Sequence, residues 1–225
     1  MSITALQSTK KALRRSMAKT LRDLTQSEVQ SQSEAIVAKV VALPAFKHAK
    51  TISCYLSMPT AEVQTGALVA NILADSGKKL FVPSLTSKEG QMDFVRLYDK
   101  EDLRTLPAGL WGIPEPTAEW KSEKRQSASK PHLREGNRIR PLHHLLAGVA
   151  FDSSLSRLGH GKGYYDHFIS SYVDAAKRPR PLLVALSLQQ QMVEAGQVPM
   201  TDHDEKVDVI ATPKDIITRE NLVIE

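Results

Sequence analysis

Short apolar runs alternate with amphipathic segments along the chain, and this alternation restricts the folds that it can adopt. The first such unit comprises the expected strand TISCYLS (51–57), the expected helix TGALVANILADSG (65–77) and the expected strand KLFVPSL (79–85). Later, PLLVALS (181–187) and VDVIAT (207–212) have the continuous apolar character of strands covered on both faces. Strands separated by helices predict a single-domain α/β fold with a mostly parallel central sheet and helices on both of its faces.

Two helices are expected before this unit begins. The first carries an apolar stripe at intervals of three or four residues, formed by Leu13, Met17, Leu21 and Leu24. Lys10 and Arg14, four residues apart, share another face of the same helix. Thr25 and Glu28 fit a capping box at the start of the second helix, which is expected to end before Pro44.

Composition places the chain among globular proteins of one domain, residues 1–225. The formal net charge of +5 favours an anionic partner such as a phosphate, a polyglutamate or a nucleic acid. Much of this charge comes from residues 117–140, which lack apolar periodicity and are expected to form a flexible basic insertion. Cys54 is the only cysteine, so no intramolecular disulfide can form.

The sequence carries no signal for membrane insertion. No run approaches the roughly 18 apolar residues that suggest a membrane span, and the first residues lack an apolar signal core. A cytoplasmic location is therefore expected, while the basic, serine-rich start of the chain leaves mitochondrial import open.

Glycines dominate GHGKG (159–163), which stands between an expected strand, LLAGVAF (145–151), and an expected helix rich in aromatic residues. Glycine backbones adopt positive φ angles, so several N–H groups can point toward one ligand, and the helix N-terminus adds partial positive charge. Such a backbone nest suits phosphate, and Arg157, His160 and Lys162 would add side-chain donors. The spacing matches neither GxxxxGK[ST] nor GxGxxG, so phosphate binding and a flexible connector are equally open from these residues alone.

A longer stretch around this loop resembles the signature of a known enzyme family. SRLGHGKGYYD (156–166), preceded by GVAFD (148–152), resembles the signature of 5-formyltetrahydrofolate cyclo-ligases, which are also called 5,10-methenyltetrahydrofolate synthetases. Four further stretches follow in the family's order: KKALR (10–14), YLSMPTAEVQT (55–65), MDFVRL (92–97) and WGIPEP (111–116). Together they span nearly the whole chain, which makes the resemblance far more specific than a short motif.

This resemblance implies an enzyme that uses ATP and Mg²⁺ to convert 5-formyltetrahydrofolate into 5,10-methenyltetrahydrofolate, with release of ADP and phosphate. A formamide oxygen leaves poorly, but a phosphorylated one departs as phosphate when the neighbouring N10 attacks the activated carbon. The protein would then act mainly by positioning its substrates and by electrostatic stabilisation. The expected partner is a folate, with or without a polyglutamate tail, and the expected assembly is a monomer.

The resemblance also implies roles for individual positions. The residues expected to bind ATP are Lys10, Arg14, Arg157, Leu158, Gly159, His160, Gly161, Lys162, Gly163, Tyr164 and Tyr165. Those expected to contact or enclose the folate are Leu56, Met58, Glu62 and Trp111, together with His160, Gly161, Lys162, Gly163 and Tyr164. The expected catalytic residues are Arg157, Lys162 and Tyr165, and the expected magnesium ligands are Asp166 and Asp208.

Two features depart from the family's pattern. His160 stands where the family commonly has arginine, and a histidine that is mostly neutral at pH 7 cannot form the guanidinium fork. His143 and His144 interrupt the apolar run before Gly148, so that strand is expected to be locally distorted or to lie at a sheet edge.

Three other interpretations are open. The first is a folate-binding protein of the same fold with weak or no catalysis. The second is a polyanion- or nucleic-acid-binding protein that uses residues 117–140, where Trp120 is the only aromatic residue available for stacking. The third is a zinc site, although no metal-ligand spacing is evident among His132, His143, His144, His160 and His203.

Overall fold

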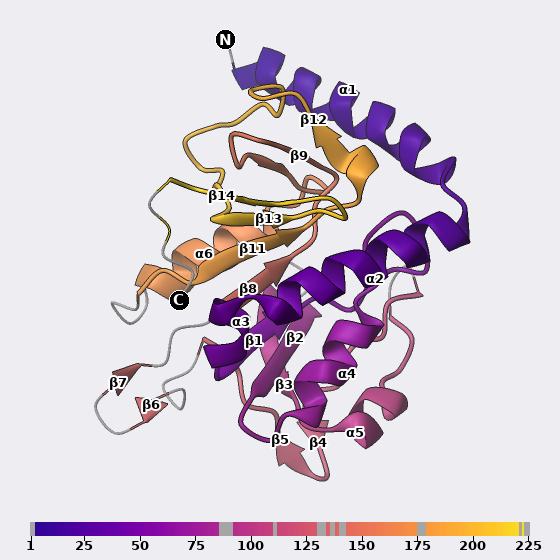
Figure 1. The fold of residues 1–225 in the computed structure, drawn as a ribbon. Coiled ribbons are helices and arrows are strands. Elements are labelled where there is room, and N and C mark those ends of the chain that lie inside the picture. The colour runs from indigo at the N-terminus through magenta and orange to yellow at the C-terminus, as the bar shows by residue number, and fades with distance from the viewer. Residues whose placement is uncertain are drawn as a thin grey trace.

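A seven-stranded sheet at the centre of the molecule confirms the predicted α/β fold (Figure 1). The structure is a computed structural model, and it describes residues 3–85, 92–109, 112–129, 134–135, 138–139, 143–174, 179–220 and 222. The strands, in their order across the sheet, are β14 (Ile216–Thr218), β13 (Val209–Ala211), β11 (Leu182–Leu186), β8 (His143–Leu146), β1 (Thr51–Cys54), β2 (Lys79–Leu85) and β3 (Met92–Leu97). The inner strands are parallel, and the edge strands β14 and β3 are antiparallel to their neighbours.

Helices cover both faces of this sheet. One face carries α2 (Gln26–Ala42), α3 (Pro44–His48) and α4 (Gly66–Ala74), and the other carries α6 (Tyr164–Asp174) (Figure 1). Successive strand residues point to opposite faces, so Leu145 belongs to the core shared with α2 and α4, whereas Leu146 belongs to the core shared with α6. None of the helices in the described ranges combines the length and the apolar character that crossing a membrane requires.

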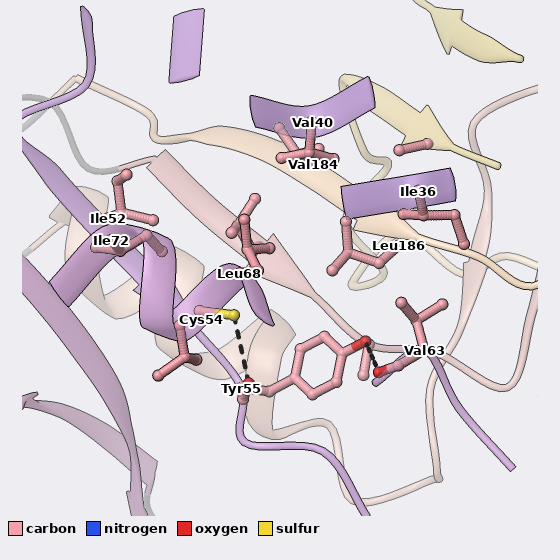
Figure 2. Packing of buried hydrophobic residues seen from close by; sticks show 14 of the residues in the cluster. Ile36, Val40, Ile52, Cys54, Tyr55, Val63, Leu68, Ile72, Val184 and Leu186 are labelled. Atoms are coloured by element: carbon pink, nitrogen blue, oxygen red, sulfur yellow. Dashed lines mark hydrogen bonds between the residues drawn. The ribbon is translucent and has the colours of Figure 1, made fainter. Parts of the chain in front are cut away.

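The core between the sheet and the α2 and α4 helices contains the single cysteine. Figure 2 labels residues of this core: Ile36, Val40, Ile52, Cys54, Tyr55, Val63, Leu68, Ile72, Val184 and Leu186. Burial raises the pKa of the Cys54 thiol well above its ordinary value, so the thiol stays protonated near neutral pH. Because the thiolate is the reactive form of cysteine, Cys54 serves here as a packing residue.

The first helix, α1 (Ile3–Arg22), packs mainly on a second, smaller sheet. This sheet consists of β10 (Arg157–Leu158), β9 (Ala150–Asp152) and β12 (Met192–Val193), and the short 3-10 helix η3 (Gln189–Gln191) precedes β12. Leu13 and Met17 of the predicted stripe pack against this sheet, and Leu21 joins the main core. The predicted capping box is also present, because the side chains of Thr25 and Glu28 each bond the other's backbone N–H group.

The prediction of one strand over 145–151 is wrong, because the chain changes sheets within it. β8 ends at Leu146, and after a short link β9 continues in the second sheet. Gly148 permits this crossing, since a Cβ atom at that position would lie 2.6 Å from the ring of Phe151. The stretch that follows β9 is the turn of a hairpin whose second strand is β10.

The expectation that the histidines place their strand at an edge is also wrong. β8 lies between β1 and β11 in unbroken register, and His144 is completely buried. Its Nδ1 atom shares a hydrogen bond with the Ser53 hydroxyl, and its ring centroid lies 4.5 Å from that of Phe94 in an edge-on contact. Nε2 has no hydrogen-bond partner among the described residues. A neutral histidine with one polar partner can thus occupy a central strand.

This burial makes folding stability depend on pH. Burial, followed by the positive charge of Arg157, lowers the pKa of His144 to about 3 from the ordinary value of 6.5. Between these two values the unfolded chain binds a proton that the folded protein does not, so stability from this group is complete above pH 6.5 and falls as the pH decreases. We expect His144 alone to lower the free energy of unfolding by about 2 kcal/mol at pH 5, while Glu62, whose pKa is raised to about 7, changes stability in the opposite direction.

Urea unfolding of the wild type and of His144→Gln, each at pH 7 and pH 5, isolates this contribution. Relative to the wild type, His144→Gln should make the change in stability from pH 7 to pH 5 more favourable by about 2 kcal/mol, whereas the same change at His48, which is exposed, should leave it as in the wild type. An unchanged difference in the His144→Gln variant would show that other groups cause the pH dependence.

Within segment 117–140, most of which was expected to be a flexible insertion, Arg125, Ser127 and Ala128 are buried against the rest of the protein. The short strands described in this segment are β4 (Glu119–Trp120), β5 (Glu123–Lys124), β6 (Arg134–Glu135) and β7 (Arg138–Ile139). Arg125 is buried in an ion pair with Asp102 of α5 (Lys100–Thr105), and Ala128 N–H donates a hydrogen bond of 2.7 Å to β3. The high content of charged residues suggests an exposed segment, but Arg125 is buried.

Candidate functional site

A cavity lies where the parallel strands end, beside the point at which the chain changes direction across the sheet. From β1 the chain proceeds to β2 and β3 on one side, and it then returns to β8 on the other side. Such switch points are common ligand sites in open α/β sheets. The strand ends supply Tyr55, Leu56, Leu85 and Ala147 to the cavity wall, and the glycine loop and the start of α6 complete it.

Gly159, His160, Lys162 and Gly163 of the glycine loop (residues 159–163) line this cavity, and with Arg157 they form the part of its wall that we call the cationic end. Gly161 and Gly163 have φ angles of +103° and +69°, a conformation that residues with a Cβ atom rarely adopt. Within the part of the chain that the structure describes, no acceptor receives a hydrogen bond from the backbone N–H groups of residues 160–163. These donors, with the helix N-terminus that follows them, are available to an anion.

Cationic side chains surround the loop. Arg14 Nε donates a hydrogen bond of 2.7 Å to Gly159 O, which places α1 directly beside the loop. Arg157 is buried, and its Nη2 atom donates to the carboxylate of Asp166 at 2.9 Å. Lys162 lines the cavity and forms no ion pair with any described residue, so its charge is free for a ligand.

The other residues predicted to bind ATP differ in whether their side chains are available to a ligand. Lys10 forms an ion pair with Asp204, so it helps to fix α1 as well as adding charge. The side chain of Leu158 is buried beneath α1, which leaves only its backbone to face a ligand. Tyr164 and Tyr165 both line the cavity, as predicted.

His160 also lines the cavity, where the family commonly has arginine. Partial removal from water, and then the charges of Arg14 and Arg157, lower the pKa of this imidazole. It is therefore neutral at pH 7 and can donate or accept a hydrogen bond without adding charge. The cationic character of this end depends on the arginines and on Lys162.

The lining supplied by the strand ends and by residues 56–62 and 113–115 is mostly apolar; we call it the apolar end, and it contains the residues expected to enclose the folate. Leu56, Met58 and Glu62 all line it, beside Pro83, Leu85, Met92 and Ile113. Trp111, the fourth residue expected there, lies outside the described residues.

Glu62 is the most buried acidic group at this end. Its side chain is 5% exposed, and its Oε1 atom accepts a hydrogen bond of 2.5 Å from Met58 N–H. Burial raises the pKa of Glu62 to about 7, although the Met58 N–H group opposes this effect by stabilising the carboxylate. Near neutral pH the carboxyl group is therefore partly protonated and partly ionised.

Each of the two carboxylates expected to bind magnesium is bound by arginine side chains. Asp166 lines the cavity, where it pairs with Arg157. Asp208 directly precedes β13, does not line the cavity, and is bound by Arg180 at 2.7 Å and by Arg219 at 3.2 Å. The described residues contain no cluster of three or more His, Cys, Asp or Glu side chains suited to a metal. Asp166 Oδ1 also accepts a hydrogen bond of 3.2 Å from Glu205 N–H, three residues before Asp208, so a magnesium site that uses both carboxylates stays a prediction.

Two residues near the cavity were not predicted from the sequence. Glu115 lines the apolar end and accepts a hydrogen bond of 3.2 Å from Leu85 N–H. Its place in the WGIPEP stretch was the available signal for it. Asp204 forms an ion pair with Lys10, which lies near the other end of the sequence, so no local sequence pattern could have predicted that contact.

The chain is similar to proteins of one enzyme family. A model of the 5-formyltetrahydrofolate cyclo-ligase family matches residues 6–213. A probable 5-formyltetrahydrofolate cyclo-ligase from Caenorhabditis elegans is 32% identical over 209 residues, which cover 92% of this chain and 94% of the relative. A mitochondrial 5-formyltetrahydrofolate cyclo-ligase from Arabidopsis thaliana is 32% identical over 216 residues, covering 92% of this chain and 75% of the relative. Among solved structures, the 5,10-methenyltetrahydrofolate synthetase of Aquifex aeolicus matches with a TM-score of 0.70 and 26% identity, covering 96% of each chain.

Proposed function

The chain belongs to the 5-formyltetrahydrofolate cyclo-ligase family, and we propose that it uses ATP to convert 5-formyltetrahydrofolate into 5,10-methenyltetrahydrofolate, with release of ADP and phosphate. The observation that carries this proposal is one cavity with a cationic, glycine-lined end and an apolar end. The cationic end suits a phosphate chain, and the apolar end suits a flat heterocycle. The reacting atoms of both substrates would meet between the two ends.

The chemistry requires no nucleophile from the protein. The formyl oxygen attacks the terminal phosphorus of ATP, and the phosphorylated oxygen then leaves as phosphate when N10 attacks the formyl carbon. The protein lowers the barrier by holding both substrates in line and by stabilising the negative charge on the transferring group. A fixed set of donors performs this role better than water does, because it needs no reorganisation during the reaction.

The residues of the cationic end would have different roles in binding and stabilising the phosphates. The free N–H groups of residues 160–163 would bind phosphate oxygens, with Lys162 and Arg14 supplying charge. Arg157 lies 5.3 Å from the ring centroid of Tyr165 and fixes its orientation. Burial raises the pKa of Tyr165, so its hydroxyl stays protonated and remains a potential hydrogen-bond donor.

We include magnesium in the proposal as the partner of the nucleotide. ATP carries magnesium on its own phosphate oxygens, and Mg²⁺ usually keeps several waters and needs only one or two carboxylates. Asp166 is the one predicted ligand that lines the cavity, and its pairing with Arg157 gives it a second role in positioning that arginine.

A spectrum tests the proposed function. Protein incubated with 5-formyltetrahydrofolate, ATP and magnesium should produce the near-ultraviolet band of the methenyl product, with one ADP formed for each product molecule. Omission of ATP should abolish the band. Folate binding without consumption of ATP would contradict the proposal and identify a folate-binding protein of the same fold.

A further inference from the structure

The proposed ring closure releases a proton that some group must accept. A bond forms between N10 and the formyl carbon, the N10–H bond breaks with its electron pair remaining on nitrogen, and the C–O bond breaks as oxygen leaves within phosphate. The product is a cation whose charge is shared by N5 and N10. A positioned base typically accelerates such a proton transfer by about 10²- to 10⁴-fold.

The described lining of the cavity includes three carboxyl groups that could act as this base: Glu62, Glu115 and Asp166. Asp166 is paired with Arg157 at 2.9 Å, at the end of the cavity that suits phosphate. Glu115 is only partly buried. Glu62 is 5% exposed and lies among the apolar residues of the end that suits the folate ring.

The contacts of Glu62 fix its carboxyl group and leave one oxygen open. Oε1 accepts the hydrogen bond from Met58 N–H, which holds the carboxyl group in place. Among the described residues, none donates a hydrogen bond to Oε2. A carboxyl group that served packing alone would be expected to have protein partners for both oxygens. Oε2 is therefore available to a donor on a ligand.

We propose that Glu62 is the base that accepts the N10 proton during ring closure. The proton passes from N10 to Glu62 Oε2 as the N10–C bond forms, and it returns to water after the product leaves. This role goes beyond the substrate contact that the family resemblance implies for Glu62. It rests on the proposed function, because it concerns one step of that reaction.

The titratable groups next to Glu62 do not compete for this proton. Cys54, Tyr55 and Tyr165 all interact with its charge, and burial raises the pKa of each of them. They are therefore neutral at pH 7, where the buried Glu62, with a pKa of about 7, is partly ionised. A base whose pKa lies near the working pH is the most effective kind.

The charged groups of the opposite end also suit this assignment. Arg157 and Lys162 are hydrogen-bond donors, and the lowered pKa of His160 makes it a weaker base than an ordinary histidine. Of these cavity groups, Glu62 combines a position at the folate end with a proton affinity matched to neutral pH.

A single-turnover experiment with Glu62→Gln separates the two chemical steps. Glutamine preserves the size of the side chain and an oxygen for Met58 N–H, but it cannot accept a proton. With 5-formyltetrahydrofolate and Mg·ATP, we expect ADP formation within a few-fold of the wild-type rate and methenyl formation slowed by about 10²- to 10⁴-fold. Glu115→Gln, the matched change at the same end, should keep the wild-type ratio of methenyl to ADP formation.

Two results would overturn the proposal. In the first, Glu62→Gln forms the methenyl product at the wild-type rate. In the second, it loses ADP formation and methenyl formation in equal proportion, which would make Glu62 a binding residue alone. A wild-type protein that forms no methenyl product would instead contradict the proposed function, so the two failures are distinguishable.

The wild-type protein provides a second test that does not depend on the folding of a variant. Because the base must be ionised, the rate of methenyl formation should fall about tenfold for each pH unit below the pKa of Glu62. ADP formation should not follow the same curve. A methenyl rate that is independent of pH between 5 and 8 would exclude Glu62 as the base.

Discussion

Arg125→Ala should lower the free energy of unfolding by about 3–5 kcal/mol, because it leaves the carboxylate of Asp102 buried without its counter-charge. Both side chains are almost completely buried, and two guanidinium N–H groups donate to the two carboxylate oxygens at 2.6 Å. The pair fastens the chain directly after β5 to α5, so its loss should also release the hairpin of β4 and β5. Urea unfolding with a common m-value measures the change.

Lys121→Ala is the matched control. Lys121 lies in the same hairpin, but its pair with Glu101 is 3.3 Å long and both side chains are more than half exposed. Its removal should change the free energy of unfolding by less than about 1 kcal/mol. The double variant Asp102→Ala/Arg125→Ala should recover part of the loss, because no unpaired charge remains buried. Equal effects of Arg125→Ala and Lys121→Ala would show that the buried ion pair contributes no more to the free energy of unfolding than the exposed one.

Lys162→Ala should lower kcat/KM for ring closure by about 30- to 800-fold, which corresponds to about 2–4 kcal/mol of transition-state stabilisation. Lys162 lines the cavity beside free backbone donors and has no ion pair with a described residue, so its charge is available to the transferring phosphoryl group. Steady-state kinetics with ATP varied at saturating folate measures the effect.

Lys11→Ala is the control for this experiment. Lys11 lies on the exposed side of α1, away from the cavity, and its loss should leave kcat/KM unchanged. A normal kcat/KM in Lys162→Ala would show that the lysine points away from the phosphates. A raised KM for ATP with normal kcat would instead indicate that it contributes only ground-state binding.

The parts of the fold that follow from local patterns could be predicted from the sequence. The capping box of Thr25 and Glu28 and the strand, helix and strand between residues 51 and 85 depend on neighbours in the chain. The break at Gly148 could not be predicted, because the ring that excludes a Cβ atom there is fixed by the tertiary fold. His144 was misjudged for the same reason, since its partner Ser53 comes from another strand.

At the site, too, local patterns could be predicted from the sequence and contacts between distant segments could not. The residues of the loop and of the stretch after β1 were predicted because they lie within continuous motifs, and the fold brings both to one cavity. Asp166 and Asp208 were expected to bind magnesium together, but no motif reports which arginine a carboxylate will bind: Asp166 pairs with Arg157, and Asp208 pairs with Arg180 and Arg219. The burial of Arg125 within the segment expected to be mostly flexible could not be predicted either, because its partner Asp102 belongs to another element.

The position of α1 has a consequence for any shortened or fused form of this protein. The helix contributes Arg14 to the loop through Gly159, and Met17 covers Val149 and Leu158 on the small sheet. Displacing the helix would therefore remove a charge from beside the glycine loop and expose an apolar surface at the same time. Loss of catalysis and a tendency to aggregate should arise together, so a leader or tag attached here is compatible with function only if it leaves this helix seated.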